Sequence, residues 1–386
     1  MTSASIDILR DLIAFPTISR DSNLELIDYC ATRLEDIGGA VEIIRDDSGT
    51  KANLFATIGP RDAGGVMLSG HTDVVPVDGQ DWTKPPFAAT EMDGRIYGRG
   101  TADMKGFVAC ALAAALATDG RHLTTPLHLA FSHDEEIGCV GVRSMIDMLD
   151  AAPVRPAMCV VGEPTGMKIA TGHKGKTALL GTCSGRAAHS SLAPQGVNAI
   201  HLACDLVAAI RALQQEIIDS GPHDDAFDIP FTTLHAGRID GGVLLNIVPE
   251  HASVTFEIRN LPEDQPERLI NRLRDAVRPV ITAAQAIAPE AGITLQVTNS
   301  YPGLSTSPDE EVVALFTELA GDDQRIKVAF GTEAGLFDSR LGVPTIVCGP
   351  GSMQQGHKPD EFIAIEQLAA CDAMLARMTD RLVAGL

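Results

Sequence analysis

The chain has 386 residues, which is enough for two domains of ordinary size. Apolar residues make up 45% of it and charged residues 21%, a globular balance that excludes a fibrous or disordered chain. Because the chain has 51 acidic and 30 basic residues, its net charge is −21. Such a surface repels nucleic-acid phosphates and anionic lipids, so we expect neither nucleic acid nor a membrane as a partner.

Two further features indicate a cytoplasmic protein. Residues 1–19 lack the basic-then-apolar pattern of a secretion signal, and the longest apolar run, 107–117, is shorter than the roughly 20 residues of a membrane helix. The eight cysteines are scattered singly, so we expect buried free thiols rather than a disulfide or thiolate framework.

Strands and helices alternate in the first and last parts of the chain. Apolar, β-branched runs predict buried strands, and helical periodicity predicts helices between them. The predicted strands are 53–58, 66–69, 127–131, 158–161 and 344–348, and the predicted helices are 104–118, 140–149 and 366–382. This alternation predicts an α/β domain in which helices cover a mostly parallel sheet.

The middle of the chain has a different order of elements. It is predicted as strand 177–183, helix 198–215, strand 231–239, strand 253–259, helix 264–277 and strand 293–298. This βαββαβ order is that of a ferredoxin-like fold. We therefore expect a catalytic domain built from residues 1–176 and 294–386, with an inserted domain over 177–293.

The first chemical motif follows the strand 66–69. His71 and Asp73 come directly after it, at the carboxyl end of a strand, where open α/β sheets bind their ligands. Asp73 is placed to accept the second ring N–H of His71, as metal-bound histidines require. Taken alone, a histidine after a strand is more often structural.

A single aspartate stands among the glycines of segment 98–106. Asp103 precedes an alanine-rich helix, so one interpretation is a helix N-cap. The other is a carboxylate that bridges two cations, with glycines allowing close backbone approach. This motif by itself does not decide between them.

Three acids in succession follow the strand 127–131. Asp134, Glu135 and Glu136 repel one another, which is costly without a nearby cation. Adjacent carboxylates point in different directions, so one can bind a metal while its neighbour contacts a water. That combination supplies a ligand and a general base for hydrolysis. A solvated loop is the alternative.

Two more strands end beside candidate ligands. Glu163 follows strand 158–161, and His357 follows strand 344–348 after a glycine-rich turn. Four predicted strands thus end in or near histidine or carboxylate residues. Two histidines and three carboxylates, one of them shared, suit Zn²⁺, with Co²⁺ or Mn²⁺ as substitutes. We therefore predict a metal site.

Taken together, these motifs resemble the metallopeptidase and deacylase family that includes acetylornithine deacetylase, succinyl-diaminopimelate desuccinylase and the glutamate carboxypeptidases. The resemblance spans essentially the whole chain, and the motifs occur in the same order. Within the family, segments 97–107, 331–334 and 349–361 look most like the acetylornithine deacetylase branch. The implied fold is zinc-peptidase-like, and its inserted ferredoxin-like domain serves as lid and dimerisation surface.

The resemblance also implies a metal centre with two zinc ions per subunit, for which cobalt can substitute. Asp103 bridges the two positions, Glu135 is the general base for a metal-bridging hydroxide, and Asp73 orients His71. The first position has His71, Asp103 and Glu163 as ligands, and the second has Asp103, Glu136 and His357.

The inserted domain is expected to supply further contacts in a homodimer. By the resemblance, His189 reaches a neighbouring active site to stabilise the oxyanion, Arg259 grips the substrate carboxylate, and Asn246 is another lid contact. Without the resemblance, all three are ordinary polar residues at strand ends. Glu333 either faces a cationic side chain of the substrate or begins a helix.

The implied reaction is hydrolysis of an N-acyl amino acid, with Nα-acetyl-L-ornithine of arginine biosynthesis as the expected substrate. The alternative is a dipeptidase, a carboxypeptidase or a deacylase of another N-acyl amino acid on the same site. A non-catalytic binding module is disfavoured, because Glu135 is present. Two residues depart from the common pattern: Gly331 replaces a cysteine frequent in the deacetylase branch, and His133 replaces a small residue.

Overall fold

The computed structural model describes residues 3–386 and divides into two compact units. Unit 1 contains the chain up to Gly172, Leu304–Val328 and Thr332–Leu386, and unit 2 contains His173–Gly303 and Ala329–Gly331. Within residues 3–386, no helix combines the length and the apolar character needed to cross a membrane.

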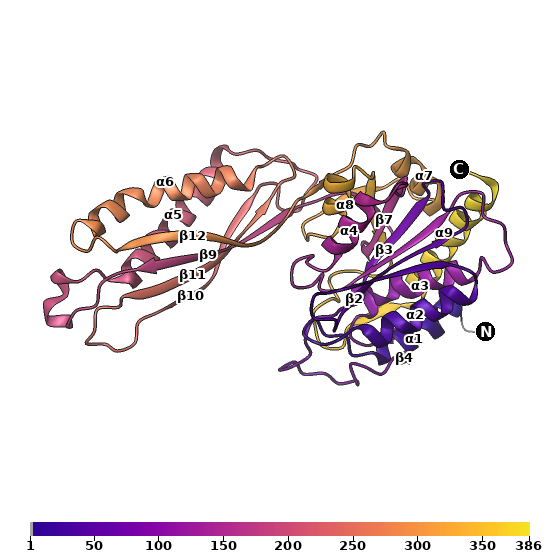
Figure 1. Ribbon diagram of the computed structural model, residues 1–386, viewed down its shortest axis with the longest axis horizontal. Coiled ribbons are helices and arrows are strands. Elements are labelled where there is room, and N and C mark those ends of the chain that lie inside the picture. The colour runs from indigo at the N-terminus through magenta and orange to yellow at the C-terminus, as the bar shows by residue number, and fades with distance from the viewer. Residues whose placement is uncertain (1–2) are drawn as a thin grey trace. The chain divides into compact units, whose positions relative to one another are not determined.

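Unit 1 is built on one large mixed sheet (Figure 1). Its strands β6, β3, β7 and β15 lie side by side and parallel, while β1, β2 and β8 join antiparallel. This confirms the predicted α/β class and places the parallel pairs at the centre. In spatial order the strands are β1 (Ala40–Arg45), β2 (Ala52–Ile58), β6 (Leu127–Ser132), β3 (Val66–His71), β7 (Met158–Pro164), β15 (Thr345–Gly349), β8 (Ile169–His173) and β13 (Leu304–Ser305), with β14 (Arg325–Val328) beside β8.

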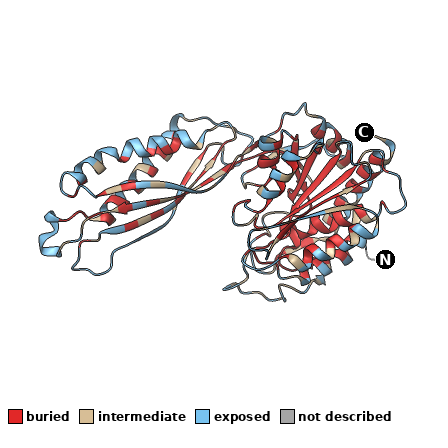
Figure 2. Ribbon diagram, viewed as in Figure 1, coloured by how far each residue is buried: buried red, intermediate tan, exposed pale blue. Residues whose placement is uncertain are grey.

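Helices cover this sheet. Helix α3 packs on β3 and β6 and is itself covered by α1, α2 and α9, whereas α4 and α8 pack together on the other side of the sheet (Figure 1). The central strands are buried because of this double cover (Figure 2), and strands covered on both faces are continuously apolar. The helices are α1 (Ala4–Ala14), α2 (Leu24–Asp36), α3 (Gly106–Leu116), α4 (Val142–Ala151), α7 (Glu311–Ala320), α8 (Ala334–Leu341) and α9 (Ile365–Ala384).

The segment before α3 is irregular, which corrects the predicted helix over 104–118. Asp103 has an extended backbone, with φ −123° and ψ 94°, and α3 begins only at Gly106. Asp103 is therefore not an N-cap. Two short strands, β4 (Thr90–Met92) and β5 (Arg95–Tyr97), precede this segment in the chain, and β16 (Phe362–Ala364) from the C-terminal part pairs with β5 to complete a small antiparallel sheet.

Unit 2 has the predicted βαββαβ order. Its antiparallel sheet has the spatial order β10, β11, β9, β12, as in a ferredoxin-like fold. Alternating burial along β9 shows that one face packs on the helices and the other faces solvent. The elements are β9 (Gly175–Ser184), α5 (Ala199–Ser220), β10 (Thr233–Gly241), β11 (His251–Asn260), α6 (Pro266–Gln285) and β12 (Gly292–Tyr301).

Two details differ from the sequence-based expectations. The inserted domain was predicted over 177–293, whereas unit 2 extends from His173 to Gly303, because β9 begins earlier and β12 ends later than the apolar runs indicated. All eight cysteines are free and seven are buried, but Cys204 is exposed on α5.

Candidate metal centre

The carboxyl ends of three neighbouring strands bring the candidate ligands together. His71 is the last residue of β3 and pairs in register with Ser132, the last residue of β6. Glu135 and Glu136 follow β6 directly, and Glu163 lies near the end of β7. Because parallel strands end at the same edge of a sheet, residues distant in the sequence meet there.

Asp103 contacts two histidines through its two carboxylate oxygens. Its Oδ1 lies 3.1 Å from Nε2 of His71, and its Oδ2 lies 3.1 Å from Nε2 of His357. On the first side, Oε1 of Glu163 is 3.7 Å from Nε2 of His71. On the second side, Oε2 of Glu136 is 3.0 Å from Nε2 of His357. One carboxylate thus spans two groups of ligand atoms.

The same cluster contains two sets of three ligand atoms, each within 4.8 Å of one another. One set is His71, Glu135 and Glu163, and the other is His71, Asp103 and Glu136. The five residues predicted to hold metals are therefore gathered in one place. Glu135, predicted as the base, also lies within ligand distance of the first position.

Glycine is required next to one of these ligands. A Cβ at Gly162 would lie 1.9 Å from the ring of Phe107 on α3. The strand that carries Glu163 can therefore approach the helix only with glycine at this position.

The buried carboxylates of this cluster favour a bound cation. Burial raises the pKa of Glu163 well above its usual range, and the charge of Asp103 adds to this effect. Burial likewise raises the pKa of Glu136 to about 7. For His71, burial favours the neutral form, but the surrounding carboxylates outweigh it and raise the pKa. Hydrogen bonds to Asp103 and Glu136 raise the pKa of His357 to about 10.

The residues present fit a pair of divalent metal ions. Buried Oε1 of Glu136 has no hydrogen-bond partner among residues 3–386, although buried polar atoms are normally satisfied. His71, Asp103 and Glu163 are each at most 3% exposed. Imidazole nitrogens with carboxylate oxygens form the mixed donor set that Zn²⁺, Co²⁺ and Mn²⁺ accept.

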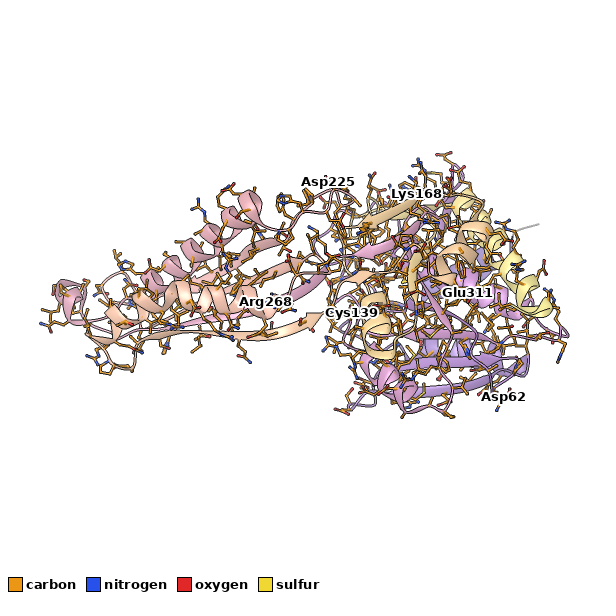
Figure 3. The ribbon with its side chains drawn as sticks, turned by 90° about the horizontal axis from the view of Figure 1, so that it is seen from above. Asp62, Cys139, Lys168, Asp225, Arg268 and Glu311 are labelled. Atoms are coloured by element: carbon orange, nitrogen blue, oxygen red, sulfur yellow. The ribbon has the colours of Figure 1, made fainter. Side chains whose placement is uncertain are left out.

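The Glu135 carboxylate accepts a hydrogen bond from a thiol. The Cys139 Sγ–H donates to Oε1 of Glu135 over 3.3 Å, and the Cys139 N–H donates to the Glu135 carbonyl over 2.8 Å. Cys139, labelled in Figure 3, lies in the loop between β6 and α4 and is buried. Burial raises the pKa of Glu135 to about 8, with a further rise from the charge of Glu136, although His71 opposes it.

Replacing this thiol tests whether it orients Glu135. We expect Cys139→Ala to lower kcat about fivefold without loss of metal, because a typical intramolecular hydrogen bond contributes roughly 0.5–1.5 kcal/mol and a thiol is a weak donor. Cys139→Ser keeps a donor and is expected to stay within about twofold of the wild type. Cys30→Ala, another buried thiol, is the control. An unchanged kcat in Cys139→Ala, measured on metal-loaded protein, would exclude this role.

Asp73 contacts His71 mainly through its backbone. Nδ1 of His71 lies 2.9 Å from the carbonyl oxygen of Asp73 and 3.6 Å from its Oδ1. The Asp73 carboxylate instead accepts the backbone N–H groups of Glu135 and Glu136 and the hydroxyl of Ser19. Asp73 therefore connects the His71 strand end with the loop that carries the two glutamates.

The remaining acid of the triplet has a different partner. Asp134 forms an ion pair with Lys51, with Nζ 2.6 Å from Oδ1, and its Oδ2 lies 3.2 Å from Nδ1 of His133. Asp134, Glu135 and Glu136 thus contact a lysine, a thiol and a histidine ligand, respectively. His133, whose role the sequence left open, pairs with Asp134.

Glu333 is buried in unit 1. Its Oε1 accepts the Ser132 hydroxyl over 2.6 Å, and its Oε2 lies 3.5 Å from the Ser69 hydroxyl. Burial raises the pKa of this carboxyl to about 7. Glu333 precedes α8, but its side chain forms no capping hydrogen bond. Contact with a substrate cation stays a prediction.

The other three predicted residues belong to unit 2. His189 and Asn246 lie close together, because the Ser190 N–H donates to the Asn246 carbonyl over 3.0 Å. Arg259 is on β11, where its Nε lies 3.1 Å from Oε1 of Glu257 and its Nη1 lies 3.4 Å from the Tyr301 hydroxyl. Their roles toward a substrate stay predictions.

Gly331 has a structural explanation. A Cβ at this position would lie 2.4 Å from the ring of Tyr301, the residue whose hydroxyl contacts Arg259. A cysteine here would displace the tyrosine, so glycine at 331 and tyrosine at 301 fit as a pair.

Two adjoining sets of carboxylate and histidine ligands lie at the carboxyl edge of this α/β sheet, and an additional glutamate lies beside them. This is the arrangement of a metallohydrolase. The chain matches the model of Peptidase family M20/M25/M40 over residues 67–381, and it belongs to that family. It is a hydrolase of this family.

Individual relatives agree with this assignment. An acetylornithine deacetylase of Aliivibrio fischeri (strain MJ11) is 34% identical over 378 residues, which cover 96% of this chain and 97% of the relative. The fold is similar to that of the metallo-carboxypeptidase Sso-CP2 of Sulfolobus solfataricus, with a TM-score of 0.80, 19% identity and 100% of both chains covered. It is also similar to that of the Bacillus subtilis YXEP protein, described as a dinuclear metal-binding peptidase, with a TM-score of 0.67, 17% identity and 99% and 98% of the two chains covered.

Proposed function

We propose that this hydrolase removes the acetyl group from Nα-acetyl-L-ornithine, a step of arginine biosynthesis, and releases ornithine and acetate. The observation that carries the proposal is near full-length similarity to a curated acetylornithine deacetylase, together with Glu135 beside the five ligand residues. The eight free cysteines suit a reducing compartment, and we place the reaction in the cytoplasm.

The chemistry divides between the metals and the side chains. Two divalent ions, zinc or cobalt, would polarise the acyl oxygen and make water a stronger nucleophile at neutral pH. Glu135 accepts the proton of the attacking water and returns it to the departing amine. Burial raises the pKa of Glu135 to about 8, and positive charge beside it would lower that pKa and favour the carboxylate form that a base requires.

The backbone contact of His189 favours the tautomer that an oxyanion requires. Its Nδ1 accepts the backbone N–H of Ser191 over 3.2 Å, so in the neutral ring the proton is on Nε2. An Nε2–H donor supports the proposed role of stabilising the tetrahedral oxyanion. The neighbouring Asn246 side chain is proposed as a second contact to the substrate.

Arg259 is proposed to bind the α-carboxylate. Its guanidinium already lies beside Glu257, which orients it without burying it completely. A charge-assisted hydrogen bond contributes about 1.5–3 kcal/mol, so Arg259→Ala is expected to lower kcat/KM at least tenfold. The control is Arg238→Ala, an exposed arginine of β10. Equal kcat/KM for both variants would contradict the assignment.

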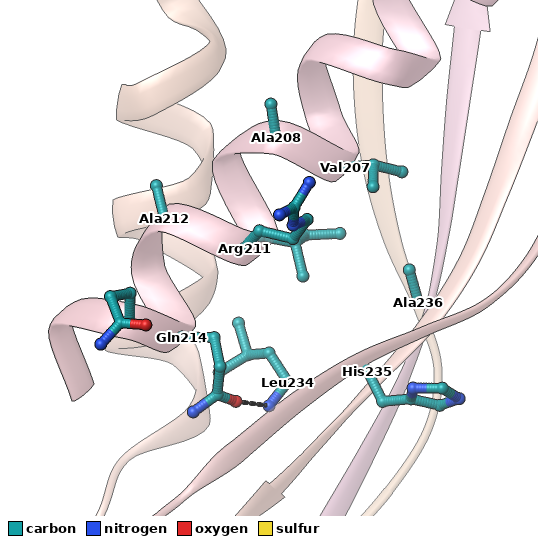
Figure 4. Close-up of a pocket in the computed structure, with 10 residues that line it drawn as sticks. Val207, Ala208, Arg211, Ala212, Gln214, Leu234, His235 and Ala236 are labelled. Carbon is teal, nitrogen blue, oxygen red and sulfur yellow. Dashed lines mark hydrogen bonds between the residues drawn. The ribbon is translucent and has the colours of Figure 1, made fainter. Parts of the chain in front are cut away.

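A homodimer through unit 2 is part of the proposal. Strand β10 is an edge of its sheet, and a groove between β10 and α5 is lined by residues such as Val207, Ala208 and Leu234 (Figure 4). The loop that carries Asn246 also exposes apolar side chains, with Val243 89% exposed. An unpaired strand edge beside apolar surface favours association with a second copy.

A substrate panel tests the proposal. Zinc-loaded and cobalt-loaded enzyme is assayed with acetylornithine, other N-acetyl amino acids, succinyl-diaminopimelate and simple dipeptides. Acetylornithine is expected to have the highest kcat/KM, with some turnover of other acetyl amino acids. A dipeptide preferred by orders of magnitude would replace the deacetylase assignment by a peptidase one and leave the metal centre intact.

A further inference from the structure

Glu361, which lies four residues after His357, accepts four hydrogen bonds and is only 1% exposed. Its Oε2 accepts from Nη1 of Arg99 over 2.6 Å and from the N–H of Gly100 over 3.0 Å. Its Oε1 accepts the N–H groups of Ala102 over 2.9 Å and Asp103 over 3.1 Å. The carboxylate is therefore the common acceptor of the segment that leads to Asp103.

This segment needs such an acceptor. Because the backbone of Asp103 is extended and α3 begins three residues later, a helix cannot satisfy these buried N–H groups. A carboxylate only accepts hydrogen bonds, whereas an amide in its place would turn an N–H toward another N–H. Glu361 thereby fixes the backbone from which Asp103 reaches both histidines.

Arg99 extends the network to the other side of the metal centre. Its Nη2 donates to Oε1 of Gln80 over 2.6 Å, and Nε2 of Gln80 donates to the carbonyl of His357 over 3.1 Å. His357 has a φ of 62°, a conformation that a non-glycine residue keeps only when its surroundings hold it. Hydrogen bonds thus run from the amide of Asp103 to the carbonyl of His357.

We propose that Glu361 is the positioning residue of the second metal position, and that through Arg99 and Gln80 it holds Asp103 and His357 in the arrangement that lets them share one ion. This inference rests on the metal centre and not on the acyl substrate. It is therefore tested by metal binding, and the substrate panel does not decide it.

The first test is zinc binding by Glu361→Gln. Metal-free protein is titrated with Zn²⁺ in competition with a chromogenic chelator, which resolves the two binding steps. We expect the dissociation constant of one of the two steps to rise at least tenfold, the lower bound for losing a group that orients a ligand. Glu366→Gln, an exposed carboxylate early in α9, removes the same charge and should leave both steps unchanged.

Two further variants separate positioning from folding. Gln80→Ala leaves Glu361 in place but removes the donor to the His357 carbonyl and the acceptor of Arg99 and Trp82. It should weaken the same step about threefold, less than Glu361→Gln does. In Arg99→Met/Glu361→Gln, no buried guanidinium is left without its partner, so its Tm should exceed that of Glu361→Gln while its zinc binding stays weak. The proposal would be overturned if Glu361→Gln bound zinc within threefold of the wild-type affinity at both steps. It would also be overturned if the double variant regained zinc affinity together with Tm.

Discussion

Glu135→Gln is expected to lower kcat at least a hundredfold while the protein keeps both metal ions. Replacing the carboxylate by an amide removes the proton acceptor, and a positioned acid or base contributes about 10²–10⁴-fold to rate. His71, Asp103 and Glu163 remain available at the first position, so metal content should not change. Metal content is measured by atomic absorption on the same samples that are assayed for kcat.

The matched variant is Glu136→Gln, one residue further along the loop. Its carboxylate lies 3.0 Å from Nε2 of His357 and has a buried oxygen without a hydrogen-bond partner, so this variant should lose metal from the second position. The comparison is informative because Glu135 also lies within ligand distance of His71 and Glu163. Equal metal loss in both variants would make Glu135 a ligand rather than the base.

That the candidate ligands lie close together could be predicted from the sequence, because each follows an apolar strand or a glycine-rich turn. Parallel strands end at the same edge, so His71, Glu136 and Glu163 had to meet once the α/β alternation was recognised. For Asp103, a bridging carboxylate was one of two interpretations of its motif, and only the resemblance favoured it over a helix N-cap. The helix that the alanine-rich run predicted from residue 104 begins only at Gly106, and the N–H groups of Ala102 and Asp103 donate to the Glu361 carboxylate instead.

The residues that the sequence did not reveal act through contacts between distant segments. Glu361 meets Ala102 across 259 positions, and Lys51 meets Asp134 across 83. No local pattern encodes such a pairing, because an acid after a turn is equally common on a solvated loop. Cys139 is close to Glu135 in sequence, but a lone cysteine among apolar residues gives no sign that its thiol donates to a carboxylate.

The second large effect is expected at His189, in the unit that lacks the metal ligands. His189→Ala should lower kcat about 10²–10³-fold, the cost of removing one oxyanion donor. Metal content should be unchanged, because His189 belongs to unit 2 and every candidate ligand to unit 1. Ser191→Ala is the control: it removes the hydroxyl that lies 2.8 Å from Nδ1 of His189 but keeps the backbone N–H that donates to Nδ1, so the imidazole itself is retained.

Subunit mixing then shows whether His189 acts within its own chain or across a homodimer. The His189→Ala and Glu135→Gln homodimers should each be nearly inactive. If His189 serves the partner's active site, a mixed dimer contains one site with both residues intact and one site with neither. Its activity should then be about half that of the wild-type dimer, because one of two sites works. If His189 serves its own chain, every site of the mixed dimer lacks one residue. The composition of the mixed dimers is verified by mass spectrometry. Action across the dimer would be excluded if these mixed dimers recovered no activity, or if a monomer were fully active.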